Sequence, residues 1–312
     1  MTRAAAALAL EAMLGYPDRV YRRIGHPVSW IGALIGGLEQ RLNRPDWPEG
    51  QRRLNGVATA ALAAACGWGF GLALQRIADR SGRPAILSAL FATPGLAQRS
   101  LHDHVEAVRR PLQAGELARA RVAVGRIVGR DTDSLSESEV AAAALESLAE
   151  SFNDGVVAPA FWLAVAGLPG LYAYKAINTA DSLIGHKEPR WRAFGWAAAR
   201  ADDGVNLVPA RIAGALVALA GGRGWRAMVR DAPRHASPNA GWPEAAMAGA
   251  LQIRLGGPAT YDGVAADRPV FNDGASAPRA DDLGRGLAVY RKACILLAVG
   301  VAAYGLIGRR RG

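Results

Sequence analysis

The sequence predicts an all-α, polytopic integral membrane protein with amphipathic helices and large polar loops on the cytoplasmic side. Of its 312 residues, 51% are apolar, yet the mean hydropathy is only +0.07, which fits a few spans joined by polar loops. Several uncharged apolar segments approach the roughly 20 residues that a bilayer crossing needs. The alternation of apolar and polar residues that is typical of strands is not sustained anywhere in the sequence. We expect a single domain over residues 1–312.

The two clearest spans are residues 54–75 and 293–308. The first has no charged residue and is flanked by arginines on both sides, and the second ends at the arginines 309–311. Arginines at the end of a span favour the cytoplasmic side. This places the C-terminus in the cytoplasm and the protein in the cell inner membrane.

Three further apolar segments are less regular. Residues 155–174 have the length of a span but contain Pro169-Gly170, so we expect a broken or re-entrant helix there. Residues 84–98 and 212–222 are shorter, and the sequence leaves open whether they cross. Segments of this length are more often buried helices or re-entrant segments.

The charge balance narrows the possible partners. The net charge is +10, with 34 arginines and three lysines, which suits anionic lipids, phosphates and carboxylates. No helix-turn-helix, zinc-finger or RNA-binding signature is present, so we do not expect nucleic acid as a partner. Cys66 and Cys294 both lie in apolar runs and form neither a disulfide pattern nor a metal-binding pattern.

The first polar block joins an acidic segment to an apolar one, over residues 130–162. Ser134 and Glu137 have the spacing of a capping box, which predicts a helix from about residue 135 to Ser151. The carboxylates of this block form either a solvated acidic face or a cation site, since Mg²⁺ prefers hard oxygen ligands. Acidic and amide side chains that could serve here are Asp131, Asp133, Glu146, Glu150, Asn153 and Asp154.

The second polar block covers residues 174–187. On a helix, its polar side chains fall within about one-third of the circumference. They form either an ion pair at a helix start or a clamp for phosphate or carboxylate. These side chains are Lys175, Asn178, Asp181 and Ser182.

The third and fourth blocks also combine charged and amide side chains. In residues 200–211, Arg211 enters an apolar run, so it either pairs with a nearby aspartate or binds an anion. Residues 234–251 predict a turn and then a helix with Pro243 in its first turn. Candidate donors and acceptors are Asp202, Asp203 and Asn206 in the third block and Arg234, His235, Asn239 and Glu244 in the fourth.

Other motifs carry less weight. His26 and the His102-Asp103-His104 segment contain possible metal ligands, but a zinc site is not expected without cysteine partners. A phosphate-binding G-x-x-x-x-G-K-[ST] motif is absent, as is a G-x-S-x-G nucleophile motif.

In their order and spacing, these blocks resemble the CobD/CbiB family of membrane-bound cobalamin-biosynthesis enzymes, the adenosylcobinamide-phosphate synthases. The resemblance covers nearly the whole chain and is carried by LGYPDRVYRRIGHPVSWIG, GRDTDSL, ESLAESFNDGVVAPAFW, YKAINTADSLIGHK, FGWAAARADDGVNLVPAR, SPNAGWPEAAMAGAL, Leu255-Gly-Gly and Tyr261-Asp-Gly. Three positions depart from the usual pattern. Ser151 replaces a usual Asn, which puts an amide role there in doubt, whereas Ala33 and Ala180 are minor changes.

The resemblance implies an ATP- and Mg²⁺-dependent ligase. Such an enzyme joins the f-propionate of adenosylcobyric acid to (R)-1-amino-2-propanol or its O-phosphate. By analogy with other ATP-driven amide syntheses, the carboxylate is phosphorylated and the amine attacks the acyl phosphate. Further implied partners are membrane lipid and either a second copy of the chain or other late corrinoid enzymes.

The implied site has three groups of residues. Catalytic candidates are Asp131, Asp133, Glu146, Glu150, Asp154, Lys175 and Asp181. Substrate-binding candidates are His26, Asn153, Asn178, Ser182, Asp202, Asp203, Asn206, Arg211, Arg234, His235, Asn239 and Glu244. Candidates for holding Mg²⁺ are Asp131, Asp133, Glu150 and Asp154.

Two other classes of protein remain possible from the residues alone. A Mg²⁺-dependent membrane prenyl or phosphoalcohol transferase would also use aspartates beside spans, although Asp202-Asp203 matches its D-x-x-D pattern only loosely. A transporter or a non-catalytic scaffold is the other alternative. A transporter is expected to show more spans and paired repeats.

Overall fold

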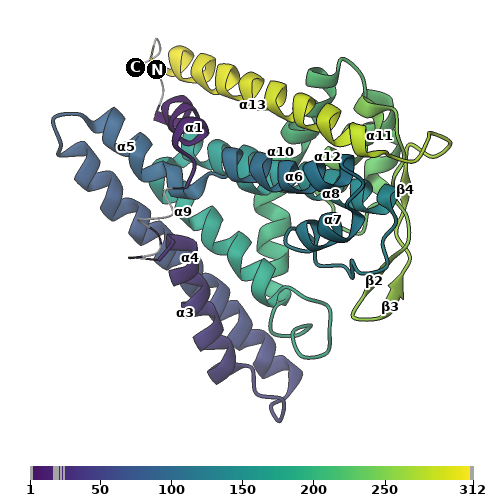
Figure 1. Cartoon of the computed structure of the whole chain (residues 1–312). Coiled ribbons are helices and arrows are strands. Elements are labelled where there is room, and N and C mark those ends of the chain that lie inside the picture. Colours follow the sequence, from purple (N-terminus) through teal and green to yellow (C-terminus); the bar gives the residue numbers. More distant parts are fainter. Residues whose placement is uncertain (1–2, 17–20, 22, 24, 310–312) are drawn as a thin grey trace. The chain divides into compact units, whose positions relative to one another are not determined.

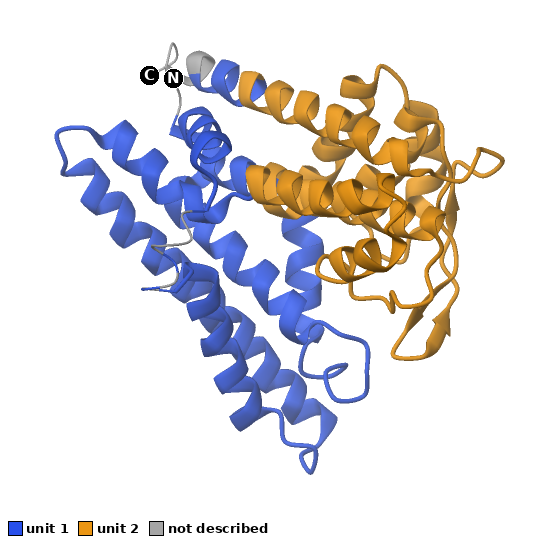
Figure 2. Cartoon of the chain, in the orientation of Figure 1, with its two compact units in different colours: residues 1–97, 158–206, 300–312 blue, residues 98–157, 207–299 orange. Residues whose placement is uncertain are grey.

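The computed structural model describes residues 3–309 apart from 17–20, 22 and 24. Most of the described chain is helical, as the sequence predicts, and it divides into two compact units (Figures 1 and 2). Unit 1 comprises residues 1–97, 158–206 and 300–312, and unit 2 comprises residues 98–157 and 207–299. Each unit is therefore assembled from segments that are distant in the sequence.

Unit 1 is a helical bundle around two long helices, α4 and α9. Its complete helices are α1 (Arg3–Leu14), α3 (Pro27–Leu42), α4 (Glu49–Asp79), α5 (Pro84–Ala92), the 3₁₀ turn η1 (Thr93–Gly95) and α9 (Ala158–Ile184). The first part of α10 (Trp196–Gly221) also belongs to it. Pro27 and Pro84 each begin their helix, where the missing N–H of proline costs nothing.

Close packing of α4 on α9 depends on glycines in α4. A Cβ on Gly67 would lie 2.4 Å from the carbonyl oxygen of Tyr172, and a Cβ on Gly71 would lie 2.3 Å from that of Leu168. Neighbouring apolar side chains form a buried cluster over α3, α4, α9 and the start of α10. Its members are Ile35, Ala63, Ala180, Ile184, Phe194 and Ala198.

Unit 2 contains shorter helices and the described strands. Its helices are α6 (Gln98–Gln113), α7 (Leu117–Val124), α8 (Glu137–Phe152), the π-helical turn η2 (Asn153–Val157), α11 (Trp225–Asp231), the 3₁₀ turn η3 (Ala232–Arg234) and α12 (Gly241–Leu251). The last parts of α10 and most of α13 (Ala280–Arg309) complete it. Phe152 of α8 packs edge-on against Tyr290 of α13, with ring centroids 5.5 Å apart.

Residues 255–271 form a β-arm, which the all-α expectation did not include because this Gly-rich stretch shows no sustained strand-like alternation. At its base, β1 (Leu255–Gly256) pairs antiparallel with β4 (Val270–Phe271). At its tip, β2 (Ala259–Tyr261) pairs antiparallel with β3 (Val264–Ala266). Leu255 and Phe271 are buried, whereas the tip is exposed. We call residues 255–271 the arm.

Four helical stretches in the described residues are long and apolar enough to cross a membrane. They are Glu49–Asp79, Glu137–Ile184, Trp196–Gly221 and Ala280–Gly305. The predicted spans 54–75 and 293–308 lie within or overlap the first and last of these stretches. Residues 212–222, left open by the sequence, fall almost entirely in the third, while α5 is too short to span. The arginine cluster that indicated a cytoplasmic C-terminus extends beyond the described residues.

The break expected near Pro169-Gly170 lies at Gly167. Within α9, Gly167 has φ 67° and ψ −157°, which is not helical. This region of backbone space is essentially restricted to glycine. Because Pro169 has no N–H to donate to the preceding turn, the helix is already weakened at this point.

Candidate functional site

Helix α8 positions two of the predicted carboxylates one turn apart. Its capping box is formed by Ser136 and Glu139, not by Ser134 and Glu137: the Ser136 hydroxyl accepts the N–H of Glu139, whose carboxylate accepts the N–H of Ser136 at 2.7 Å. The helix therefore begins two residues later than the sequence indicated. Glu139 serves this cap, while Glu146 and Glu150 lie farther along the helix.

Glu146 is a buried carboxylate with three donors around it. Its Oε2 accepts hydrogen bonds from Arg130 Nη2 and from Arg268 Nη1, the latter at 2.9 Å. Its Oε1 accepts the backbone N–H of Gly256 at 2.7 Å. Only 2% of Glu146 is exposed, and a buried charge is strongly unfavourable unless it is paired. The two guanidinium groups and the amide supply this pairing.

Arg268 links Glu146 to a second buried carboxylate, Glu244. Arg268 Nη2 lies 3.6 Å from Glu244 Oε2, and His235 Nε2 lies 3.8 Å from Glu244 Oε1. Among the described residues, Glu244 Oε2 has no hydrogen-bond partner. Burial, together with the charges of Glu150 and Glu146, holds the pKa of Glu244 well above its usual range. We call Arg130, Glu146, His235, Glu244 and Arg268 the Glu146 cluster.

A cavity of about 140 Å³ opens beside the Glu146 cluster. It presents charges of both signs, with two arginines and two glutamates on its wall. The side chain of Tyr261, from the arm, contributes an aromatic face. The lining residues are Ile127, Val128, Gly129, Arg130, Ala143, Glu146, Ser147, Glu150, Tyr261 and Arg268. This volume is small for a ligand site, so it suits a small charged molecule.

The remaining acidic residues of the first block also belong to unit 2. Asp131 accepts backbone N–H groups from the tip of the arm, and Asp133 is exposed. Asn153 Nδ2 donates to Asp154 Oδ1 at 2.8 Å within η2. Single turns of π-helix are frequent at functional sites.

The second and third blocks come together in unit 1, between α9 and α10. Asn178 Nδ2 donates to Asp202 Oδ1 at 3.2 Å, and Asn206 Nδ2 donates to Asp202 Oδ2 at 3.0 Å. Tyr174 donates to Asn206 Oδ1 and Lys175 donates to Asn178 Oδ1, each at 3.2 Å. In these five side chains, the α9–α10 network, the Asp202 carboxylate lies between two amides, with the amine of Lys175 at one end and the hydroxyl of Tyr174 at the other.

Three other predicted residues of unit 1 lie near this network or at its ends. Ser182 donates to the carbonyl oxygen of Asn178 at 2.9 Å, and Asp203 pairs with Arg200 at 3.5 Å. The carbonyl oxygen of Asp181 accepts the N–H of Gly185, at the end of α9. They stay predictions for the site.

His26 caps the start of α3. Its Nδ1 accepts the N–H of Val28 at 3.2 Å, and its ring packs on Tyr16 and Tyr21. Burial lowers the pKa of His26, and the charge of Lys175 lowers it further. Both effects favour the neutral imidazole, in which Nδ1 accepts the hydrogen bond and Nε2 carries the proton.

Arg211, at the end of the third block, contacts an amide and an aromatic ring of the fourth block instead of the aspartate that the sequence suggested. It donates to Asn239 Oδ1 at 3.1 Å and stacks on Trp242, with its guanidinium carbon 4.6 Å from the ring centre. Arg234 donates to the carbonyl oxygen of Val270 at 3.1 Å, at the base of the arm. Both arginines therefore have structural contacts within unit 2.

A comparison with known proteins fits this pattern of residues. The profile of the family described as CobD/Cbib protein matches residues 4–290. The chain belongs to the CobD/CbiB family. A Rhodobacter capsulatus relative, cobalamin biosynthesis protein CobD, is 51% identical over 302 residues, which cover 95% of each chain. Proteins of the same name from a Sinorhizobium species and Rhizobium meliloti are 46% and 43% identical, over 97% and 96% of this chain and 97% and 95% of theirs. No solved structure matches the chain.

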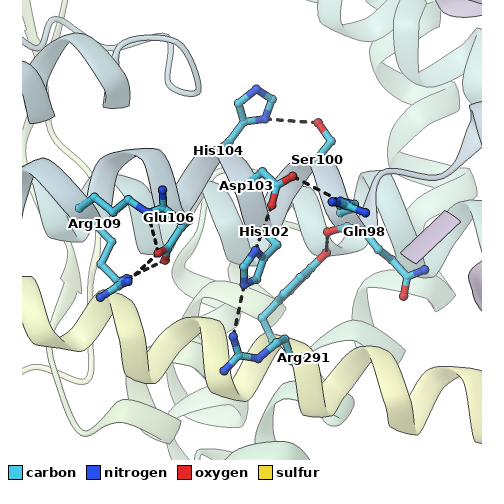
Figure 3. Close-up of polar contacts among 11 residues, drawn as sticks. Gln98, Ser100, His102, Asp103, His104, Glu106, Arg109 and Arg291 are labelled. Carbon is cyan, nitrogen blue, oxygen red and sulfur yellow. Dashed lines mark hydrogen bonds and ion pairs between the residues drawn. The ribbon is translucent and has the colours of Figure 1, made fainter. Parts of the chain in front are cut away.

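In this CobD/CbiB family member, the histidines of α6 do not converge on a common ligand. His102 and His104 point to opposite sides of the helix, as Figure 3 shows. His102 lies 3.3 Å from Asp103 Oδ1 and 3.3 Å from Arg291, while His104 contacts Ser100. Within the described part of the chain, no three His, Cys, Asp or Glu residues are grouped to hold a metal.

Sequence reasoning missed several residues of the candidate site. Arg130 precedes Asp131 in the GRDTDSL motif, and its position next to the candidate aspartates was a usable signal. Arg268, Tyr261 and the N–H of Gly256 come from the arm, whose sequence showed no periodicity. Only the pairing of its strands brings these groups to α8.

Proposed function

We propose that this CobD/CbiB family member is an ATP-dependent ligase that forms adenosylcobinamide or its phosphate. It would join the f-propionate of adenosylcobyric acid to (R)-1-amino-2-propanol or to its O-phosphate. The family membership supports a role in cobalamin biosynthesis, since the relatives at 43–51% identity carry the name cobalamin biosynthesis protein CobD.

The observation that carries the proposal is the charged cavity beside the Glu146 cluster. Arg130 and Arg268 offer fork-shaped donors that suit phosphate or carboxylate oxygens. Glu150 lines the same cavity and offers a carboxylate for an ammonium group. A small molecule with an amine at one end and a phosphate at the other would satisfy both signs of charge. We therefore assign this cavity to the amine substrate.

The proposed reaction needs the amine to lose a proton before it attacks. A carboxylate near the ammonium is a suitable base when its pKa lies closer to neutrality. Burial raises the pKa of Glu244, whose Oε2 lies 3.6 Å from Arg268 Nη2. Glu150, on the cavity wall, is the candidate for direct contact with the amine.

The residues present include a carboxylate that could hold Mg²⁺ and a lysine that could bind the phosphates of ATP. Mg²⁺ in phosphoryl-transfer sites is usually held by one or two carboxylates and by substrate phosphates. Because Glu150 is assigned to the amine, Asp154 in η2 is the carboxylate we propose for this, and the ion would neutralise phosphate charge. Lys175 of the α9–α10 network is a further candidate for phosphate or carboxylate binding.

We further propose that the enzyme is a multi-pass protein of the cell inner membrane, with its active site facing the cytoplasm. The four span-length helices support membrane insertion, and the basic net charge suits anionic lipid. ATP is available on the cytoplasmic side. A homo-oligomer or a complex with other late corrinoid enzymes would keep the corrinoid near the membrane.

A direct assay tests the proposed reaction. Protein purified in nanodiscs is incubated with adenosylcobyric acid, ATP, Mg²⁺ and either aminopropanol or its O-phosphate. We expect mass spectrometry to detect an amide product, with one phosphate released from ATP for each amide formed. Formation of no amide with either amine, by protein whose helical circular dichroism is intact, would contradict the proposal.

A growth test provides a second readout in cells. Deletion of the gene should abolish corrinoid synthesis from cobyric acid but leave synthesis from added cobinamide intact. Growth of the deletion strain on cobyric acid alone would contradict the proposed step.

A further inference from the structure

Among the contacts between the arm and the rest of unit 2, a carboxylate accepts backbone N–H groups at the base and another does so at the tip. At the base, Glu146 Oε1 accepts the N–H of Gly256 at 2.7 Å. At the tip, Asp131 accepts two N–H groups and donates its own N–H to the carbonyl oxygen of Thr260 at 2.8 Å. The arm contributes Tyr261 and Arg268 to the cavity wall. Anything that fixes the arm therefore fixes this wall.

The tip of the arm has the geometry of an anion-binding turn. Asp262 and Gly263 connect β2 to β3 and have φ values of 48° and 76°. Positive φ at both central residues is what a two-residue type I′ hairpin turn requires, and Asp-Gly is a preferred sequence for it. Successive N–H groups of such left-handed residues point to one side and can surround an anion.

Asp131 fills this turn with its side chain. Its Oδ2 accepts the N–H of Gly263 at 2.8 Å, and its Oδ1 accepts the N–H of Asp262 at 3.2 Å. Hydrogen bonds to an ionised acceptor are roughly twice as strong as neutral ones. Both carboxylate oxygens are thus directed at the hairpin rather than at the cavity.

The middle of the arm depends on these two attachments. Gly256 and Gly257 have φ values of 78° and 90°, a conformation that gives the chain a sharp change of direction between base and tip. Arg268 lies in the segment between β3 and β4 and reaches Glu146. Because the tip pairs through three residues on each strand only, its own ladder is too short to fix its position.

We propose that Asp131 is a positioning residue that holds the tip of the arm, and with it Tyr261, against the cavity. Asp131 acts through the arm and is not itself a ligand of Mg²⁺, in contrast to the role expected from the sequence. The assignment of the cavity to the amine substrate rests on the proposed function. The attachment of the arm does not, and it is measured separately.

Hydrogen–deuterium exchange tests the attachment without any activity measurement. The full-length protein in nanodiscs is compared with the Asp131→Ala and Asp131→Asn variants. We expect peptides that cover residues 259–266 to exchange at least about tenfold faster in Asp131→Ala, because amides lose protection when their hydrogen bonds open. In Asp131→Asn, one acceptor oxygen remains, so exchange should be intermediate. Peptides from α8 should be unchanged in both variants, which shows that unit 2 is folded.

Asp267→Asn is the matched control. Asp267 is an exposed aspartate of the same arm, directly after β3, and its replacement by Asn removes the same charge as Asp131→Asn does. Its exchange over residues 259–266 should equal that of the wild-type protein. Wild-type exchange in Asp131→Ala, or equally fast exchange in Asp267→Asn, would overturn the role of Asp131 as the attachment of the tip.

Steady-state kinetics separate positioning from metal binding. The apparent affinity for the amine is proportional to the fraction of molecules in which the arm is held against the cavity. A tenfold fall in that fraction therefore raises KM for the amine about tenfold. At saturating amine, kcat of Asp131→Ala should stay within about twofold of the wild-type value, because bound substrate favours the state in which the arm lies against the cavity. The Mg²⁺ concentration for half-maximal rate should not change. A large loss of kcat with a higher Mg²⁺ requirement would overturn the proposal in favour of a metal ligand.

The two proposals fail in different ways. If the wild-type protein forms no amide, the proposed function fails while the exchange experiment still decides whether Asp131 holds the arm. If the amide forms but exchange over residues 259–266 does not respond to Asp131→Ala, only the positioning role fails.

Discussion

At the scale of single residues, the site depends on how one buried carboxylate is neutralised. Glu146 is almost fully buried in α8 and has two guanidinium groups and one amide as donors. Removing one partner of such a group leaves a buried charge that is poorly compensated. The same residues line the cavity, so the stability of unit 2 and the charge of the cavity are linked.

Replacing Arg268 should therefore reduce stability. We expect Arg268→Gln to lower the free energy of unfolding by about 3–5 kcal/mol, since the buried charge of Glu146 loses one of its two cations. The melting temperature in detergent measures this. Arg254→Gln is the control, because Arg254 is exposed on the same segment and its substitution should leave the melting temperature unchanged. Equal melting temperatures for the two variants would contradict the linking role of Arg268.

The raised pKa of Glu244 predicts a pH dependence of stability. Burial raises its pKa above the ordinary value, so the folded state binds this proton more tightly than the unfolded state does. The contribution to stability is complete below the unfolded pKa and is lost as pH rises through the folded pKa. Relative to Glu244→Gln, which cannot ionise, wild-type protein should lose melting temperature as pH rises from about 4.5. A difference that is constant or reversed in sign over this range would show that Glu244 is not held protonated.

At the scale of secondary structure elements, glycine determines how closely two long helices approach. Gly67 and Gly71 face α9 at distances that leave no room for a Cβ, whereas Gly69, on the same helix, has open space around it. The carbonyl groups they approach belong to backbone and cannot turn aside. Small residues at such contacts let membrane helices pack closely.

Two alanine substitutions in α4 should therefore have opposite effects. In Gly71→Ala the new Cβ meets the carbonyl oxygen of Leu168, which should force the helices apart and cost about 1–3 kcal/mol, as overpacking does. In Gly69→Ala no contact is made, and the better helix propensity should be neutral or stabilise by up to about 1 kcal/mol. Thermal unfolding in detergent measures both. A Gly71→Ala protein as stable as Gly69→Ala would contradict the close approach of α4 and α9.

Local sequence signals predicted the long apolar helices and the helices of the polar blocks but shifted some of their details. The first block did predict a capped helix. Ser134/Glu137 and Ser136/Glu139 have the same spacing, so the sequence offers two capping boxes, and the structure uses the second. The expected break in α9 lies at Gly167, two residues before Pro169. In both cases several residues could serve, and the surrounding structure selects one.

At the scale of the whole molecule, each compact unit contains polar residues from different parts of the chain. Unit 2 brings together the first and fourth blocks in the Glu146 cluster, and unit 1 brings together the second and third in the α9–α10 network. Helical stretches of span length occur in both sets of residues. The proposed reaction requires both groups of polar residues on the same side of the membrane.

Cysteine labelling tests this requirement. Single cysteines at positions 154 and 178, introduced after Cys66 and Cys294 are replaced by alanine, should both react with a membrane-impermeant maleimide from the cytoplasmic side. Labelling in inverted and in right-side-out vesicles distinguishes the two sides. Reaction of the two positions from opposite sides would contradict the shared cytoplasmic side on which the proposed reaction depends. A cysteine at the exposed position 267 reports on unit 2 independently of the first two.

The sequence by itself determined the helical class, the principal apolar spans and the family, because periodicity, length and motif order are local properties of the chain. It also placed Glu146, Glu150 and Glu244 among the candidate residues. Only the tertiary structure decided which charges meet. Arg268 reaches Glu146 across 122 positions of sequence because the strands of the arm pair and return the chain to α8. Asp131 meets the turn of the arm for the same reason, and no local pattern encodes a contact between groups so distant along the chain.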